Sequence, residues 1–244
     1  MPGVDLVTQL GTTPWTDVDG AALTRALQRA RFDLMGVVSR RALCGDITAG
    51  NAEVKALVDS VPQMRGWAVV NPAYPERSSE EMRKYLGSAK WLGAALYPQM
   101  VGQRLNTVSA REVINAYRRY TKPLLVSVPN GDAVRDLEEL ATEFNTMKFV
   151  AAGAGGDQWQ DAMFAAKRAV NIFLEPFSGG AHRGKLEALL ATLGPNRVLF
   201  ASNHPERNPG SSIGILLDSR LSETERQGVL SGNATRLFSF LRAQ

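Results

Sequence analysis

The stretch Lys148-Phe-Val-Ala-Ala152 begins a pattern that repeats twice downstream, at Asn171-Ile-Phe-Leu174 and at Arg197-Val-Leu-Phe-Ala201. A longer amphipathic stretch separates each apolar run from the next. The two stretches have helix starts at Asp157 and Arg183. Short buried strands that alternate with amphipathic helices are typical of βα units around a parallel sheet. This part of the sequence therefore predicts three consecutive strand–helix units.

The same alternation continues to the N-terminus and gives eight units. Eight βα units predict an α/β fold, a (β/α)8 TIM barrel, and the 244 residues of the chain match the roughly 250 that such a barrel needs. The predicted strands are Val4–Leu10, Phe32–Val38, Gly66–Val70, Leu92–Leu96, Pro123–Val128, Lys148–Ala152, Asn171–Leu174 and Arg197–Ala201.

Helix starts lie between these strands. In the stretch from Asp132 to Phe144, apolar residues recur at helical spacing, so one face of the helix is expected to pack on the sheet. The other predicted starts are Asp17, Asn51, Ser78 or Ser79, Ser109, Asp157 and Arg183.

The chain shows no internal repeat and no flexible linker, so residues 1–244 are predicted to form a single domain. The tail, Leu221–Leu241, predicts two helices broken near Gly232 that close the barrel or pack beneath it. The loops Asn71–Ser78 and Asn203–Ser212 follow strands. Both are therefore expected at the C-terminal rim, where barrels of this type bind ligands.

Charge and composition narrow the range of partners. The 28 basic and 24 acidic residues are interspersed and give a net charge of +4, without the basic stripe that nucleic acid binding requires. A small anionic ligand fits this charge better. Cys44 is the only cysteine, which excludes an internal disulfide and a cysteine metal cluster. No stretch predicts a secretion signal or a membrane partner, so a cytoplasmic location is expected.

Five segments carry a resemblance to a known family: Arg197-Val-Leu-Phe-Ala-Ser-Asn-His-Pro205, Gly232-Asn-Ala-Thr-Arg-Leu-Phe238, Gly155-Gly-Asp157, Val4–Gly11 and Gly93–Pro98. These segments resemble the amidohydrolase-related family of TIM barrels, the amidohydrolase 2 type of the metal-dependent hydrolase superfamily. In this family the strand-eight segment usually ends Gly-Ser-Asp-x-Pro and the terminal helix usually begins Gly-Asn-Ala. Together they extend over nearly the whole chain.

The resemblance also implies where a metal would bind. Hydrolytic members use a His-x-His pair on strand one, histidines on strands five and six, and an aspartate after strand eight. The matching positions here are Val7, Gln9, Ser127, Gly153 and Asn203. These side chains are neutral or apolar, whereas a catalytic zinc needs imidazole, thiolate or carboxylate ligands. The metal-ligand motifs are therefore degenerate, and no cofactor is expected.

The only two histidines give the candidates for catalysis. His182 follows strand seven, His204 follows strand eight, and Glu175 lies near a strand end between them. In a metal-free reaction His204 would transfer a proton, Glu175 would orient the imidazole, and Arg183 or Arg207 would hold an anionic group. Convergence of the three into a two-His, one-carboxylate metal site is the alternative. Histidines that only bond backbone or water are the simplest interpretation.

Three of the positions that the resemblance assigns to the metal site are also candidates for ligand binding. We expect Gln9, Ser127 and Asn203 to bind a ligand together with Tyr97 and with Arg183 or Arg207. Tyr97 and Gln99 end the fourth predicted strand and are further polar candidates at the rim. The run Gly153-Ala-Gly-Gly156 predicts a turn because it lacks the spacing of a phosphate loop.

Among the tryptophans, Trp67 and Trp91 are expected in the core, while Trp15 and Trp159 are candidates for the rim.

Two classes of function follow from the sequence. The favoured one is a non-hydrolytic binding or partner subunit, either a homo-oligomer or a heteromer with an active amidohydrolase paralogue. The alternative is a metal-independent hydrolase, lactonase or decarboxylase that acts on a small carboxylated compound.

Overall fold

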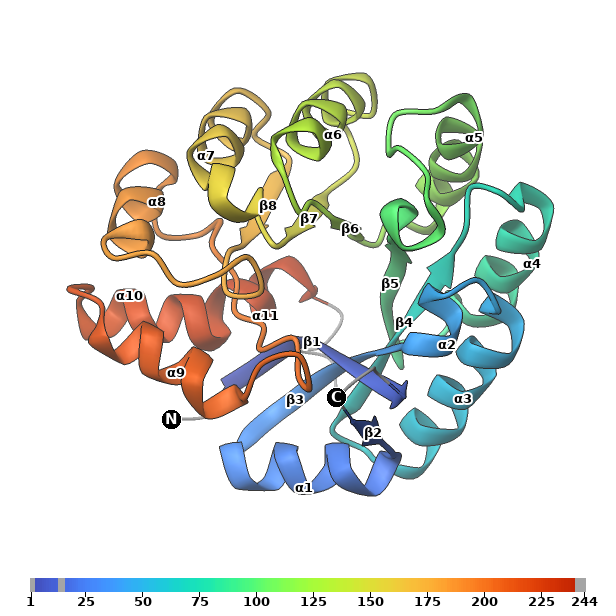
Figure 1. The fold of residues 1–244 in the computed structure, drawn as a ribbon, viewed down its shortest axis with the longest axis horizontal. Coiled ribbons are helices and arrows are strands. Elements are labelled where there is room, and N and C mark those ends of the chain that lie inside the picture. Colours follow the sequence, from blue (N-terminus) through green and yellow to red (C-terminus); the bar gives the residue numbers. More distant parts are fainter. Residues whose placement is uncertain (1–2, 13–15, 240–244) are drawn as a thin grey trace.

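The computed structural model describes residues 3–12 and 16–239. Helices surround the strands in a ring (Figure 1). The strands are β1 (Gly3–Thr12), β2 (Asp17–Val18), β3 (Phe32–Ser39), β4 (Met64–Val70), β5 (Trp91–Leu96), β6 (Leu124–Ser127), β7 (Phe149–Ala152) and β8 (Ile172–Glu175). The helices of the first half are α1 (Gly20–Ala30), α2 (Arg40–Leu43), α3 (Ile47–Ser60), α4 (Pro75–Tyr85), η1 (Pro98–Val101), α5 (Val108–Tyr117) and η2 (Arg118–Tyr120). Those of the second half are α6 (Gly131–Glu143), η3 (Gly156–Gln158), α7 (Trp159–Arg168), α8 (Lys185–Leu193), α9 (Pro209–Asp218), α10 (Glu223–Gln227), η4 (Gly228–Gly232) and α11 (Asn233–Leu237).

The strands pair in the order β2-β1-β3-β4-β5-β6-β7-β8. From β1 and β3 through to β7 and β8 each neighbouring pair is parallel, as βα units require. The short strand β2 instead pairs antiparallel with the end of β1 and was not predicted. The α/β TIM-barrel architecture predicted from the sequence is confirmed.

The eighth predicted strand, Arg197–Ala201, closes the barrel without forming a regular strand. Its backbone is bonded on both sides: the Leu199 N–H donates to the Leu174 carbonyl at 2.8 Å, and the Leu6 N–H donates to the Phe200 carbonyl at 3.2 Å. Only isolated bridges form along it. The sequence therefore located the closing segment correctly but predicted more regular pairing than exists.

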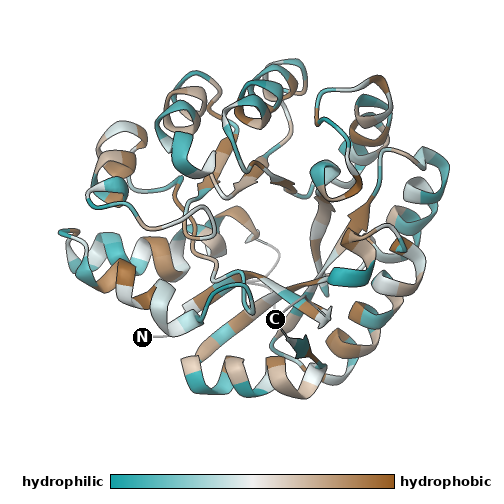
Figure 2. Ribbon diagram, viewed as in Figure 1, coloured by the Kyte–Doolittle hydropathy of each residue, from teal (hydrophilic) through white to brown (hydrophobic). Residues whose placement is uncertain are grey.

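Buried side chains form two apolar layers. One fills the barrel interior and the other lies between the strands and the helices. Figure 2 shows the apolar colour concentrated on the strands and on the inward faces of the helices. Trp67 and Trp91 belong to these layers: the Trp67 indole N–H donates to the Leu6 carbonyl at 2.7 Å, and Trp91 stacks on Tyr85 at 4.4 Å. Both tryptophans are core residues, as predicted.

Several helices begin at other residues than predicted. The first begins later, because Asp19 and not Asp17 caps α1. The next four begin earlier. Asp46 caps α3, so that Asn51 lies inside α3 and is buried, and Ser78 likewise lies inside α4. Thr107 caps α5, and Asn130 caps α6.

The C-terminal helices run on without the predicted break near Gly232. The π-helical turn η4 joins α10 to α11, and Gly232 keeps ordinary right-handed helical angles. Asn233 ties α11 to the closing segment, because its side-chain amide donates to the Val198 carbonyl at 2.8 Å. Phe238 packs edge-on against Trp67 at 5.7 Å in the barrel interior. The last two residues of the predicted tail, 240 and 241, lie outside the described residues.

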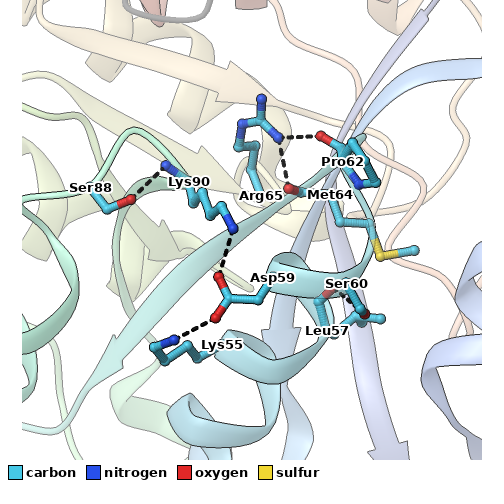
Figure 3. Close-up of polar contacts among 9 residues, drawn as sticks. All are labelled: Lys55, Leu57, Asp59, Ser60, Pro62, Met64, Arg65, Ser88 and Lys90. Carbon is cyan, nitrogen blue, oxygen red and sulfur yellow. Dashed lines mark hydrogen bonds and ion pairs between the residues drawn. The ribbon is translucent and has the colours of Figure 1, made fainter.

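The N-terminal end of the barrel carries exposed ion pairs (Figure 3). Asp59 at the end of α3 contacts Lys55 and also Lys90, the latter at 2.7 Å. Hydrogen bonds from these two lysines lower the pKa of Asp59 to about 2. The contacts tie α3 to the residue that precedes β5. Within the described residues no helix has both the length and the apolar character needed to span a membrane.

Candidate active site at the barrel mouth

A cavity of about 730 Å³ lies at the C-terminal ends of the strands. Gln9 reaches it from β1, Ser127 from β6, and Asn203 from the closing segment. Arg40 and Tyr97 come directly after β3 and β5. The carboxyl ends of parallel strands meet at one rim of a barrel, so side chains distant in sequence converge there.

A chain of hydrogen bonds crosses one side of the cavity. The Gln9 amide donates to Asn203 Oδ1 at 2.8 Å, and Arg40 Nη1 donates to Gln9 Oε1 at 2.9 Å. The same Nη1 contacts Glu206 Oε1 at 2.9 Å. Asn203 has a φ of 54°, a left-handed conformation that asparagine tolerates better than most residues. This side of the cavity is therefore polar, fixed and centred on one guanidinium.

Hydroxyl groups line the opposite side. The Gln99 amide donates to the Ser127 hydroxyl, and Tyr97 lies at the end of β5 beside them. Burial raises the pKa of Tyr97, and the negative charge of Glu175 raises it further. The Tyr97 phenol therefore keeps its proton at neutral pH and can act as a donor.

Glu175 lies fully buried beneath the cavity at the end of β8. Its carboxylate accepts N–H bonds from Phe177 at 2.7 Å, Ser178 at 3.0 Å and Gly153 at 3.2 Å, and a further bond from the Ser178 hydroxyl. Burial raises the pKa of Glu175, and these donors oppose that shift. The carboxylate holds the turn after β8. Neither imidazole is among its hydrogen-bond partners in the described part of the chain.

Asp5 is a second buried acid, on β1, which the sequence analysis did not single out. It accepts from the Ser202 N–H at 2.8 Å and from the Ser202 hydroxyl at 2.5 Å, and so joins β1 to the closing segment. Burial raises the pKa of Asp5 to about 7, although the bonds from Ser202 lower it. No periodicity marks such a residue, because its burial depends on how the barrel closes.

Neither histidine is among the residues that line the cavity. His204 is half-buried, burial lowers its pKa, and its Nδ1 has no hydrogen-bond partner within residues 3–12 and 16–239. His182 is exposed, with Nε2 3.4 Å from Asp157 Oδ1. Among the described residues no three His, Cys, Asp or Glu side chains form a group that could hold a metal. The alternative of a two-His, one-carboxylate site is therefore wrong, since the Glu175 carboxylate is hydrogen-bonded to the loop that follows β8.

The positions implied by the family resemblance do not fit a divalent metal either. Val7 is a buried apolar residue, and Gly153 has no side-chain donor atom. Gln9 and Asn203 are neutral amides bonded to each other, and Ser127 is bonded to Gln99. Neutral amide and hydroxyl ligands leave the charge of the ion uncompensated. The residues present at these positions therefore do not fit a catalytic divalent metal.

Five of the six residues predicted to bind a ligand line this cavity. They are Gln9, Tyr97, Ser127, Asn203 and Arg207. The sixth, Arg183, lies with His182 in a separate surface pocket of about 830 Å³ beside α8 and α9. Arg40 and Glu206 were not predicted as site residues. Arg40 lies two residues after the predicted strand Phe32–Val38, and only the longer observed strand β3 brings it directly to a strand end as Tyr97 is.

Three further predictions concern the glycine-rich turn after β7 and two tryptophans expected at the rim. Gly153 to Gly156 form a turn, as predicted, with the Gly155 N–H donating to the Val128 carbonyl at 2.7 Å. Trp159 packs against the layer between strands and helices and is not among the cavity-lining residues. Trp15 lies outside the described residues.

The family model for amidohydrolases matches residues 19–240. No curated protein matches the sequence.

Solved structures of decarboxylases share the fold at low identity. The 5-carboxyvanillate decarboxylase of Novosphingobium aromaticivorans, with bound manganese, is 11% identical, with a TM-score of 0.79 over 98% of this chain and 97% of its own. The 2,6-dihydroxybenzoate decarboxylase of Rhizobium is 12% identical, with a TM-score of 0.79 over 98% and 99%. A dihydroxybenzoic acid decarboxylase of a Polaromonas species, also with manganese, is 14% identical, with a TM-score of 0.77 over 99% and 98%. At such identities the likeness is one of fold.

Proposed function

The chain belongs to the amidohydrolase family, and we propose that it binds a small carboxylated compound in the mouth cavity and decarboxylates it without a divalent metal ion. The observation that carries the proposal is the chemistry of the cavity. Arginines, amides and hydroxyls line it together with the carboxylates of Asp157 and Glu206, and in the described residues no group of three metal-ligating side chains is present.

Arg207 is the side chain that we assign to the carboxylate. It lines the cavity, and no acid forms an ion pair with it in the part of the chain that the structure describes. A guanidinium presents N–H groups in a planar fork that matches a carboxylate. An unpaired arginine in a concave site is therefore a ready position for the carboxylate of a ligand.

Decarboxylation suits these residues better than hydrolysis does. Hydrolysis needs an activated water, and the position that would supply a carboxylate base holds Asn203, whose amide cannot take a proton. Decarboxylation needs no activated water. In a β-keto acid the carbon–carbon bond breaks, carbon dioxide leaves, and the electron pair passes to the neighbouring carbonyl oxygen. In a hydroxybenzoate the carbon that bears the carboxylate is protonated first, and when carbon dioxide leaves the electron pair restores the aromatic ring and its phenol.

In both cases a proton takes the place of the carboxylate on carbon, after the bond breaks in a β-keto acid and before it breaks in a hydroxybenzoate. Tyr97 lines the cavity, and burial keeps its phenol protonated, so we assign this step to its hydroxyl group. The phenolate regains a proton from solvent at the open mouth. The decarboxylases of similar fold that are named for hydroxybenzoates support aromatic acids as the compounds to try first. β-Keto acids are the second class to try, because their own carbonyl group takes up the electron pair.

The test is turnover in the presence of a chelator. Protein treated with EDTA is incubated with hydroxybenzoates and β-keto acids, and the decarboxylated product is measured by chromatography. We expect product to form with EDTA present and Arg207→Gln or Tyr97→Phe to lower the rate by about a hundredfold. Arg183→Gln is the matched control because it removes an arginine from outside the cavity.

Two results would overturn the proposal. Activity that appears only when manganese is added would show that the cavity uses a metal after all. Ligand binding without turnover would instead favour the second candidate function, a binding or partner subunit. The neutral and apolar side chains at the family's metal positions are the observation that favours this second function. Gel filtration alone and with an active paralogue would then test for a homo-oligomer or a heteromer.

A further inference from the structure

Glu206 places a carboxylate of the protein itself inside the cavity. It follows the closing segment, and its Oε1 lies 2.9 Å from Arg40 Nη1. The two side chains are only 29% and 18% exposed. The contact is therefore a partly desolvated ion pair at the site where an anionic ligand would bind, unlike the exposed pairs around the helices.

The arginine is held in place independently of Glu206. Arg40 Nη1 also donates to Gln9 Oε1, and Gln9 is fixed in turn by Asn203. Beneath Arg40 lies Gly11, at which a Cβ would stand 3.4 Å from the arginine Cβ. Removing the Glu206 carboxylate would therefore leave the guanidinium near its present position and without a counter-ion.

Glu206 contacts only one nitrogen of the Arg40 guanidinium group. Among the three guanidinium nitrogens of Arg40, only Nη1 forms a hydrogen bond within the described part of the chain. A carboxylate that binds two nitrogens of the fork forms two parallel charge-assisted bonds and is held more firmly than one that binds a single nitrogen. A ligand carboxylate can therefore displace Glu206.

We propose that Arg40 forms a second anion position in the cavity, which Glu206 fills in the unliganded protein and the second anionic group of the ligand takes over. This inference rests on the proposed function, in which Arg207 holds the first carboxylate. It assigns the substrate class: compounds with two anionic groups, such as aromatic dicarboxylates, rather than simple monocarboxylates.

The experiment compares two ligands by isothermal titration calorimetry on EDTA-treated protein. Benzoate carries one carboxylate and benzene-1,3-dicarboxylate carries two. Glu206→Gln is expected to strengthen dicarboxylate binding by about tenfold and to change benzoate binding little, because only the dicarboxylate competes with Glu206. Asp157→Asn is the matched control: Asp157 also lines the cavity and loses the same charge, but its contact is with His182.

A double variant tests whether Arg40 is the arginine that binds the second anionic group of the ligand. In an Arg40→Gln background, Glu206→Gln should no longer strengthen dicarboxylate binding, since the position itself has been removed. Equal gains from Glu206→Gln and Asp157→Asn, or a gain that persists without Arg40, would indicate a general charge effect and overturn the inference. Benzoate binding would then still support the proposed function. Failure of both ligands to bind any of these proteins would overturn both proposals.

Discussion

Asp5 lies fully buried on β1, where Ser202 donates both its N–H and its hydroxyl to the carboxyl group. Burial raises the pKa of Asp5 from 3.8 to about 7. Between these values the folded protein keeps a proton that the unfolded chain has lost. The free energy of unfolding should therefore fall as the pH rises from 3.8 to about 7, by up to about 1.4 kcal/mol per pH unit.

Asp5→Asn tests this linkage, because the amide keeps the shape of the side chain and does not titrate. Urea unfolding of both proteins at several pH values should give a stability difference that favours the variant more as the pH rises. A difference that stays constant from pH 4 to pH 7 would show that Asp5 does not take up a proton on folding. The negative charge of Glu175 is one of the causes that raise the pKa of Asp5, so the difference between the two proteins reports the titration of Asp5 together with this coupling.

Gly36 on β3 lies where the packed barrel leaves no room for a side chain. A Cβ there would stand 2.1 Å from the Leu6 carbonyl oxygen and 2.9 Å from the Trp67 indole nitrogen. Backbone cannot move aside as a side-chain end can, so Gly36→Ala should lower the unfolding free energy by roughly 3 kcal/mol or more. Gly87→Ala is the control, since nothing lies within 4 Å of its Cβ. Equal denaturation midpoints for the two variants would contradict this account of the packing.

At the scale of elements, Asn51 links α3 to β4 and α4. Its amide donates to the Val69 carbonyl and to Glu81 Oε2, both at 3.0 Å, and its oxygen accepts from the Val69 N–H at 2.8 Å. Asn51→Ala would leave these buried groups without partners and should cost roughly 2–4 kcal/mol. Asn115→Ala, an exposed site on α5, should cost under about 0.5 kcal/mol in the same chemical denaturation experiment.

The element boundaries show what the sequence can and cannot specify. Apolar runs located seven parallel strands and the closing segment, because buried strands must be apolar in any barrel. Asparagine favours helix starts, so the sequence predicts a cap at Asn51, but in the structure its amide donates to the Val69 backbone of a neighbouring strand. Glycine favours helix ends, so the sequence predicts a break at Gly232, whereas Asn233 holds the helix against the Val198 carbonyl. Such tertiary hydrogen bonds override local preference and cannot be derived from periodicity.

At the scale of the whole molecule, closure of the barrel brings the site together. Gln9 and Asn203 are 194 residues apart and share a hydrogen bond, and Arg40 meets Glu206 across 166 residues. The family resemblance predicted the first pair as site residues, because Gln9 and Asn203 stand at two of the family's metal-ligand positions. The ion pair depends on how the loop after the closing segment folds over the mouth, which the sequence does not reveal.

The central claim is that the mouth of this barrel is built to hold an organic anion and not a divalent metal. Equilibrium dialysis of the purified protein against micromolar manganese, followed by elemental analysis, tests it most directly. The account predicts far less than one ion per chain. One tightly held ion per chain, lost when Gln9 and Asn203 are replaced by alanine, would contradict it.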